Sequence, residues 1–145
     1  MKRGEPLRRY TPLTRSTPMR AVSPARRARL RGYVSVRTEV YVRCGGMCEL
    51  CGLGLRADAF DCHHRLRRSQ GGLDDLATCV ALHRHCHQWV HDHPHQAMLI
   101  GFLCPSTHRV THWPLHLHRL LWVRPVGNHW ESARPTFGQR IGDVP

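Results

Sequence analysis

Residues 44–94 read CGGMCELCGLGLRADAFDCHHRLRRSQGGLDDLATCVALHRHCHQWVHDHP, and this stretch decides the fold. It contains a Cys-x-x-Cys pair, Cys48 and Cys51, and a second pair with the same internal spacing, His83 and Cys86. Two short-spaced ligand pairs separated by a loop are what a closed tetrahedral zinc site requires. A redox dithiol shares the Cys-x-x-Cys form, but the second pair favours zinc. We therefore predict that these four residues bind one structural Zn²⁺.

The neighbouring residues leave two alternatives open for this site. His85 could replace His83 as a ligand, although the equal spacing of the pairs favours His83. Four further cysteines have no comparable spacing, and free cysteine is usually a small buried residue. We predict that they are structural, with the first two as alternative ligands: Cys44, Cys62, Cys79 and Cys104.

A second group of histidines lies between and after the zinc pairs. His63 and His64 are adjacent, and His87 and His91 are four residues apart, which places the latter two on one face of a helix. Cys86 is turned by about 100° around the same helix. One helix could therefore hold zinc on one side and a second metal on the other. Asp61 is a candidate partner for a ligand histidine.

The charge of the chain points to a polyanionic partner. The 145 residues include 22 Lys and Arg against 10 Asp and Glu, a net charge of +12, and all basic residues except Lys2 are arginine. Arginine binds phosphate bidentately, so nucleic acid is the expected partner. A basic protein without such a partner is the alternative. The seven cysteines are an odd number and no apolar leader is apparent, so we expect a cytoplasmic protein without a membrane segment, not a secreted one.

Residues 1–31 form a distinct basic segment with prolines at every sixth position, Pro6, Pro12, Pro18 and Pro24. Proline fixes φ and removes a backbone donor, so we predict an extended, mostly disordered arm that forms no helix and follows a phosphate backbone or enters the minor groove. A solvated tail is the alternative.

The remaining chain is divided into two parts. Residues 32–103 are predicted to form the metal-binding domain, with a helix at 96–103 and a helix at 33–43, where a strand is the alternative. Residues 104–145 are predicted to pack on it as an extension, with a short strand or helix at 115–123. No chemistry is assigned to this extension.

The order of these motifs resembles that of the HNH endonuclease family. The resemblance covers about residues 40–100, and the Pro/Arg-rich leader resembles that of small phage-type members with a Cys-x-x-Cys and His-x-x-Cys zinc site. It implies a small zinc-stabilised α+β fold with a ββα-metal (His-Me finger) core, in the interior of a phage-infected or bacterial cell. The matching residues are Cys48-x-x-Cys51, His63-His64, Gly71-Gly72, Val80-Ala81-Leu82, His83-x-x-Cys86-His87, His91-Asp-His-Pro94, Ala97 and Gly101.

The resemblance also implies roles for single residues. His64 stands at the position of the general base, and His63, His87 and His91 stand at ligand positions for one catalytic divalent ion, Mg²⁺, Mn²⁺, Ni²⁺ or Zn²⁺. Thr78 stands where the family usually has the asparagine that orients the base. Threonine lacks the two-ended reach of an amide, so either it orients the base more weakly or activity is reduced.

Three arginines follow the predicted base and are candidates for holding the nucleic-acid backbone: Arg65, Arg67 and Arg68. A solvated basic turn is the alternative for the last two. The predicted function is a metal-dependent endonuclease that hydrolyses the phosphodiester bonds of DNA. The alternatives are a non-catalytic zinc-dependent nucleic-acid-binding module and a nuclease of structured DNA or RNA.

Overall fold

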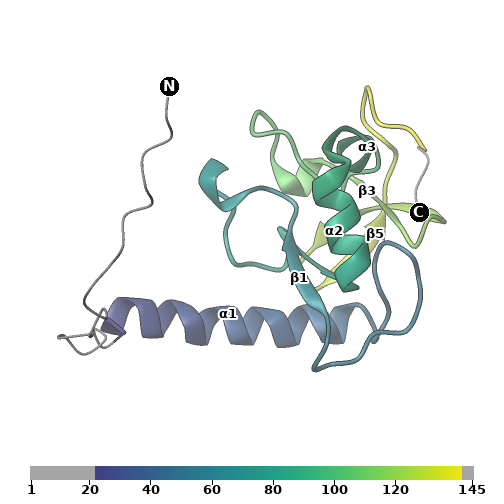
Figure 1. Ribbon diagram of the computed structural model, residues 1–145. Coiled ribbons are helices and arrows are strands. Elements are labelled where there is room, and N and C mark those ends of the chain that lie inside the picture. Colours follow the sequence, from purple (N-terminus) through teal and green to yellow (C-terminus); the bar gives the residue numbers. More distant parts are fainter. Residues whose placement is uncertain (1–21, 142–145) are drawn as a thin grey trace, which may run out of the picture.

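The computed structural model describes residues 22–141 and combines helices with two small sheets (Figure 1). A long helix lies along one side of the body, and the N-terminal half of this helix extends beyond it (Figure 1). The elements are, in chain order, α1 (Pro24–Arg43), β1 (Asp61–His64), η1 (Arg68–Gln70), β2 (Cys79–Leu82), α2 (Arg84–Asp92), α3 (Pro94–Leu99), η2 (Val110–His112), β3 (Leu115–Leu117), β4 (Leu121–Val126) and β5 (His129–Ser132).

Helix α1 begins at Pro24, inside the segment for which the proline repeat predicts no helix. Ser23 caps it by accepting a hydrogen bond from the Arg26 backbone N–H, and Pro24 occupies the first turn, where its missing N–H is not needed. The expectation of a segment without helix up to residue 31 is therefore wrong for residues 24–31. Residues 1–21, the rest of the predicted arm, lie outside the described residues. The helix predicted at 33–43 is confirmed.

Strands β1 and β2 form an antiparallel hairpin that carries two of the predicted functional histidines. His63 lies opposite Val80, and His64 lies opposite Cys79. Helix α2 follows β2 directly and contacts β1. This β-β-α order confirms the predicted mixed fold.

The chain after α3 forms a three-stranded antiparallel sheet in the order β3-β4-β5. The segment predicted as one short element, 115–123, is β3 and the start of β4, joined by a turn in which His118 and Arg119 adopt positive φ. Helix α3 ends at Leu99, earlier than predicted. Gly101 follows with φ of +82°, and a Cβ there would lie 1.9 Å from the Pro114 carbonyl oxygen.

A buried charge network joins these parts. The Arg43 guanidinium, at the end of α1, forms an ion pair of 3.0 Å with Glu49, and these side chains are 2% and 0% exposed. Arg43 also donates to the carbonyls of Leu76 and Cys79, and the Trp130 indole N–H donates to Glu49. The network connects α1, the first Cys-x-x-Cys pair, β2 and β5.

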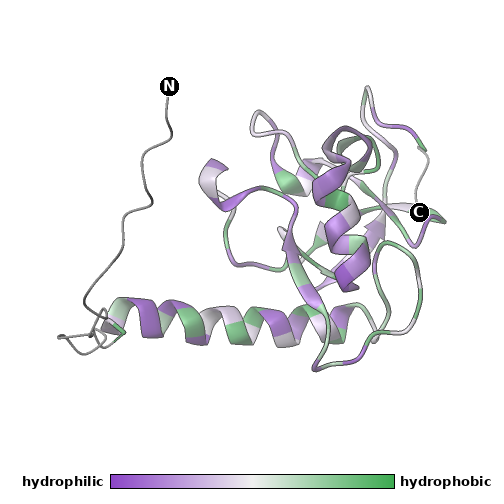
Figure 2. Ribbon diagram, in the orientation of Figure 1, coloured by the Kyte–Doolittle hydropathy of each residue, from purple (hydrophilic) through white to green (hydrophobic). Residues whose placement is uncertain are grey.

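The core is small, and β2, α2 and the segment after α3 supply many of its residues. Its largest fully buried apolar side chains include Leu50, Leu82, Ile100, Phe102 and Leu115. Polar and apolar segments alternate along α1 (Figure 2), and only Val40 of this helix is buried. Among the described residues, no helix has the length and apolar character needed to cross a bilayer.

Candidate metal sites and active site

The four residues predicted to bind structural zinc come together. Cys48, Cys51, His83 and Cys86 each offer a ligand atom, and these atoms all lie within 4.8 Å of one another. The His83 Nε2 donates to the Gly54 carbonyl at 3.0 Å, and its Nδ1 lies 3.4 Å from the Cys51 sulfur. A ring whose Nε2 carries the proton presents a lone pair on Nδ1, which is the form that binds a metal.

The geometry also selects between the two histidines that the sequence left open. His83 belongs to the cluster, whereas the His85 ring stacks on the His83 ring with a centroid distance of 5.1 Å. The cluster is therefore compatible with a Cys₃His zinc site made of the predicted residues.

A tight turn presents the first cysteine pair. The Cys48 N–H donates to the Leu53 carbonyl, the Gly52 N–H donates to the Cys48 carbonyl, and Gly52 has φ of +75°. A hydrogen bond from Cys86, with further bonds from backbone N–H groups, lowers the pKa of the Cys48 thiol to about 4. The site thus favours a thiolate, the form in which cysteine binds zinc. The other cysteines are buried, as predicted, and none belongs to the cluster: Cys44, Cys62, Cys79 and Cys104.

The second predicted cluster also forms. His63 from β1 and His87 and His91 from successive turns of α2 offer ligand atoms within 4.8 Å of one another. The Nε2 atoms of His87 and His91 are 2.9 Å apart, a distance that one ion with bonds of about 2.0–2.1 Å to each nitrogen can span. The four-residue spacing of His87 and His91 brings these two rings together on one face of α2, as expected for a helix.

Each of two rings in this cluster has a polar partner that sets its orientation. The Asp61 carboxylate binds the His87 Nδ1 at 3.0 Å, as predicted, which leaves Nε2 for a metal. The His63 Nε2 donates to the Phe102 carbonyl at 3.0 Å, which leaves Nδ1 free. Burial lowers the pKa of His63 to about 3, so this ring is neutral. Imidazole nitrogens held in this way suit a divalent transition-metal ion.

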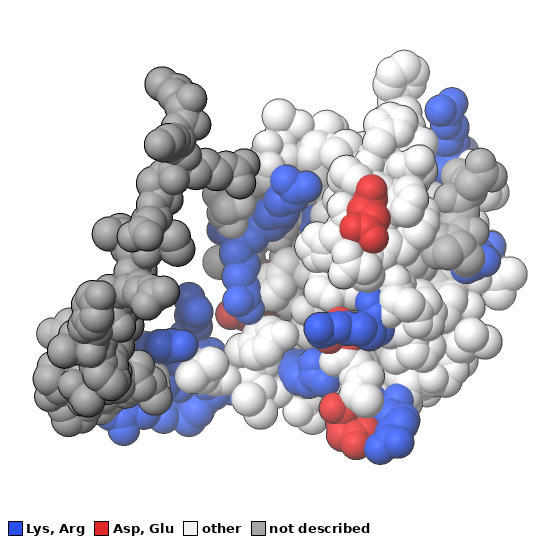
Figure 3. Space-filling view, viewed as in Figure 1, with Lys and Arg blue, Asp and Glu red and all other residues white. Residues whose placement is uncertain are grey.

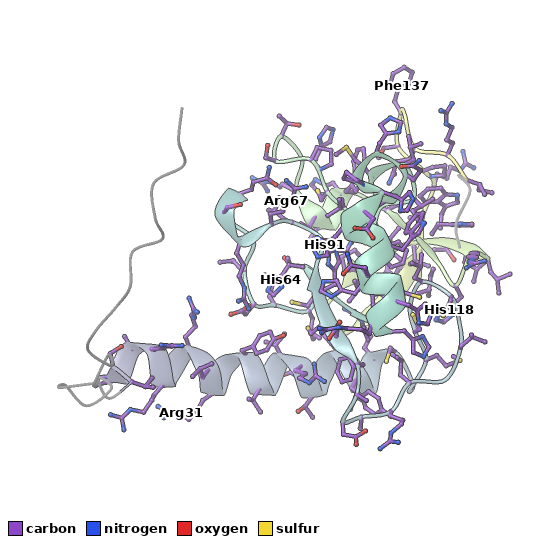
Figure 4. All side chains as sticks on the ribbon, viewed as in Figure 1. Arg31, His64, Arg67, His91, His118 and Phe137 are labelled. Atoms are coloured by element: carbon purple, nitrogen blue, oxygen red, sulfur yellow. The ribbon has the colours of Figure 1, made fainter. Side chains whose placement is uncertain are left out.

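The cluster opens into a cavity of about 320 Å³. The three cluster histidines line it together with His64, Arg67, Arg68 and Tyr33 of α1. His64, Arg67 and His91 lie close together beside α2 (Figure 4). The predicted base, the candidate ligands and two of the predicted arginines therefore share one cavity.

Asp74, which the sequence analysis did not single out, holds the His64 ring. Its Oδ1 lies 2.7 Å from the His64 Nε2 and 2.6 Å from an Arg68 guanidinium nitrogen. The same Nε2 also faces the Arg68 Nε at 3.3 Å, but the carboxylate is closer and can only accept, so we assign the proton to Nε2 and the lone pair to Nδ1. Burial opposes ionisation of Asp74, but the hydrogen bonds from His64 and Arg68 outweigh it and lower the pKa of this carboxyl group.

Thr78 does not take the orienting place predicted for it. Its side chain is buried, its N–H donates to the Asp75 carboxylate, and its carbonyl accepts from the Arg65 N–H. The structure has no hydrogen bond between the Thr78 hydroxyl and His64.

The sequence signal that could have found Asp74 is an acidic residue just after the Gly71-Gly72 turn. The chain must pass close to itself at this turn, since a Cβ on Gly72 would lie 2.0 Å from the Leu66 carbonyl oxygen.

The predicted nucleic-acid role of Arg65 is wrong. Its side chain is 0% exposed, and it donates to the carbonyls of Gly101, at 2.8 Å, and Trp113. Burial lowers the pKa of this guanidinium to about 10. Arg65 therefore connects β1 to the segments after α3 and cannot reach a substrate. Arg67 and Arg68 are exposed and line the cavity.

Comparison with known protein families places this site in a class. Residues 48–93 match the model of the HNH endonuclease family, and this segment contains both metal-ligand clusters, His64 and the β-β-α unit. This segment is therefore similar to HNH endonuclease domains, and the match indicates a nuclease with nucleic acid as its kind of substrate. The chain matched neither a curated protein nor a solved structure.

Proposed function

We propose that the protein is a metal-dependent endonuclease that hydrolyses DNA phosphodiester bonds with His64 as the general base. One observation carries the proposal. The His64 ring, with its lone pair on Nδ1, lines the same cavity as the converging imidazoles of His63, His87 and His91. A base and a metal site that share one cavity are what hydrolysis of a phosphodiester needs.

His64 takes a proton from the attacking water at Nδ1. Histidine is the side chain most often used as a general base in enzymes. The Asp74 carboxylate, 2.7 Å from Nε2, holds the ring and stabilises the imidazolium that forms when the proton arrives. Asp74 is therefore a positioning residue that acts through His64.

His63, His87 and His91 would hold one divalent ion, and Arg67 would bind a phosphate oxygen. When bound, the ion supplies positive charge that stabilises the crowded phosphate and the leaving oxygen. Arg67 is exposed at the cavity, whereas Arg68 is paired with Asp74. The Cys₃His cluster has a different role, because it joins the first cysteine turn to the start of α2 and so supports the domain.

A plasmid-nicking assay with Mg²⁺, Mn²⁺, Ni²⁺ or Zn²⁺, each with and without chelator, tests the proposal. His64→Ala should abolish nicking while far-UV circular dichroism and DNA binding stay near those of the parent. His129→Ala, which removes an exposed imidazole outside the cavity, is the matched control and should cut normally. Undiminished cutting by His64→Ala would refute the base assignment. Binding without cutting under all four metals would instead indicate a non-catalytic nucleic-acid-binding module.

A further inference from the structure

The N-terminal half of α1 is basic and does not pack on the body. Residues 24–32 are all exposed, and this half of the helix extends past the body (Figure 1). It carries four arginines and no acidic residue, and basic side chains gather over this end of the helix (Figure 3). Tertiary packing supplies most of the stability of helices in proteins. This segment has little such packing.

The four arginines fall on two sides of the helix. At about 100° per residue, Arg26 and Arg29 lie within about 40° of Tyr33, which lines the His64 cavity. Arg27 and Arg31 are turned from Tyr33 by about 120° and 160°. Arg31 accordingly lies on the side of α1 that faces away from His64 and Arg67 (Figure 4).

Tyr33 is the point where the helix and the cavity meet. The Arg68 guanidinium lies 5.2 Å from the centre of the Tyr33 ring, and Arg67 lines the same cavity. Arg26 precedes Tyr33 by two helical turns, about 10 Å along the axis. Successive phosphates of one strand are about 3.4 Å apart along a duplex axis, so the helix spans about three of them. The positive charge at the cavity thus continues along one side of α1.

We infer that this side of α1, defined by Arg26 and Arg29 and here named the α1 arginine face, binds the phosphate backbone of duplex DNA and leads it to the His64 cavity. The inference rests on the proposed function for its choice of DNA, but it concerns binding and is measured without cleavage. Arg27, on the other side of the helix, is less available to a phosphate because its guanidinium already donates to the Val22 carbonyl at 3.0 Å.

Two variants with equal charge change separate the α1 arginine face from the general charge of the helix. Arg26→Gln/Arg29→Gln removes the face, and Arg27→Gln/Arg31→Gln removes the same charge from the other side. Both are made in full-length protein with His64→Ala to prevent cutting, and circular dichroism checks that the helix content is equal. Fluorescence anisotropy with a labelled DNA duplex then gives Kd across a range of salt concentrations.

Loss of two phosphate contacts should reduce the slope of log Kd against log salt by about 1.8. Between about 50 and 200 mM salt, the parent's affinity should therefore fall roughly 12-fold more than that of Arg26→Gln/Arg29→Gln. Arg27→Gln/Arg31→Gln should reduce the slope by less than half of this amount. Equal slopes for the two pairs, no duplex binding by the parent, or a contrast confined to single-stranded DNA would overturn the inference.

Cleavage assays on variants that retain His64 test the proposed function separately from the α1 arginine face. Arg26→Gln/Arg29→Gln should raise KM with little change in kcat, since α1 contributes to binding and not to the chemical step. A slope contrast in a protein that never cuts DNA would support the α1 arginine face and refute the nuclease. Normal cutting with equal slopes for the two pairs would do the reverse.

Discussion

Glu49→Gln should be among the most destabilising conservative substitutions in this protein. Both oxygens of the fully buried Glu49 carboxylate are saturated, with two bonds from Arg43 at 3.1 and 3.0 Å. The Ala81 N–H adds a third bond at 2.7 Å, and the Trp130 indole adds a fourth at 2.8 Å. Glutamine keeps the volume but removes the negative charge, and it turns an NH₂ group toward one set of donors.

The expected loss follows from the guanidinium that remains. The Arg43 side chain is 2% exposed and would be left without a counter-charge. Breaking a buried ion pair by removing one partner costs about 3–5 kcal/mol, against a total stability of about 5–15 kcal/mol for a small domain. The variant should therefore be marginally folded. The exposed pair of Arg124 and Glu131, 3.4 Å apart and 50% and 43% exposed, gives a matched control. Glu131→Gln should cost about 0–1 kcal/mol.

Denaturant unfolding with saturating zinc measures both variants, by far-UV circular dichroism and tryptophan fluorescence. Trp130 contacts Glu49 directly, so its fluorescence reports on the network. Arg43→Met/Glu49→Leu, which removes both charges, should recover part of the loss because no buried charge stays unpaired. Equal losses for Glu49→Gln and Glu131→Gln, or a double variant less stable than Glu49→Gln, would refute the reasoning.

Three further predictions concern the metal sites and the base. Cys51→Ala should unfold the domain, since zinc-dependent folds lose their folding free energy with the metal, and a folded, zinc-free variant on circular dichroism would contradict the site. Asp61→Asn should weaken Ni²⁺ binding to the histidine cluster by about 10–100-fold in calorimetry, because a neutral amide replaces the charged acceptor of the His87 ring; unchanged affinity would remove Asp61 from the site. Asp74→Asn should lower kcat with little change in KM while Thr78→Ala stays near the parent, and Asp74→Glu should restore part of the rate. The reverse order of the Asp74 and Thr78 effects in single-turnover cleavage would return the orienting role to Thr78.

Features that depend on local spacing could be predicted from the residues alone. His87 and His91 converge because four residues make about one helical turn, and the cysteine turn forms because glycines allow positive φ. The start of α1 was also readable, because Ser23 and Pro24 form a common helix start. The predicted arm extends to residue 31 because the repeat gives Pro24 the same meaning as its other prolines, whereas proline is favoured at the first position of a helix.

The positions and partners of single polar side chains depend on the tertiary structure. Arg65 is buried because its acceptors, the carbonyls of Gly101 and Trp113, come from segments 36 and 48 residues away. The same applies to Asp74, which reaches His64 only after the chain turns at Gly71-Gly72, and to Glu49, which meets Trp130 from β5. Residue type and neighbours do not distinguish a buried arginine from a phosphate-binding one, because the packing of distant segments sets which charges lose contact with water.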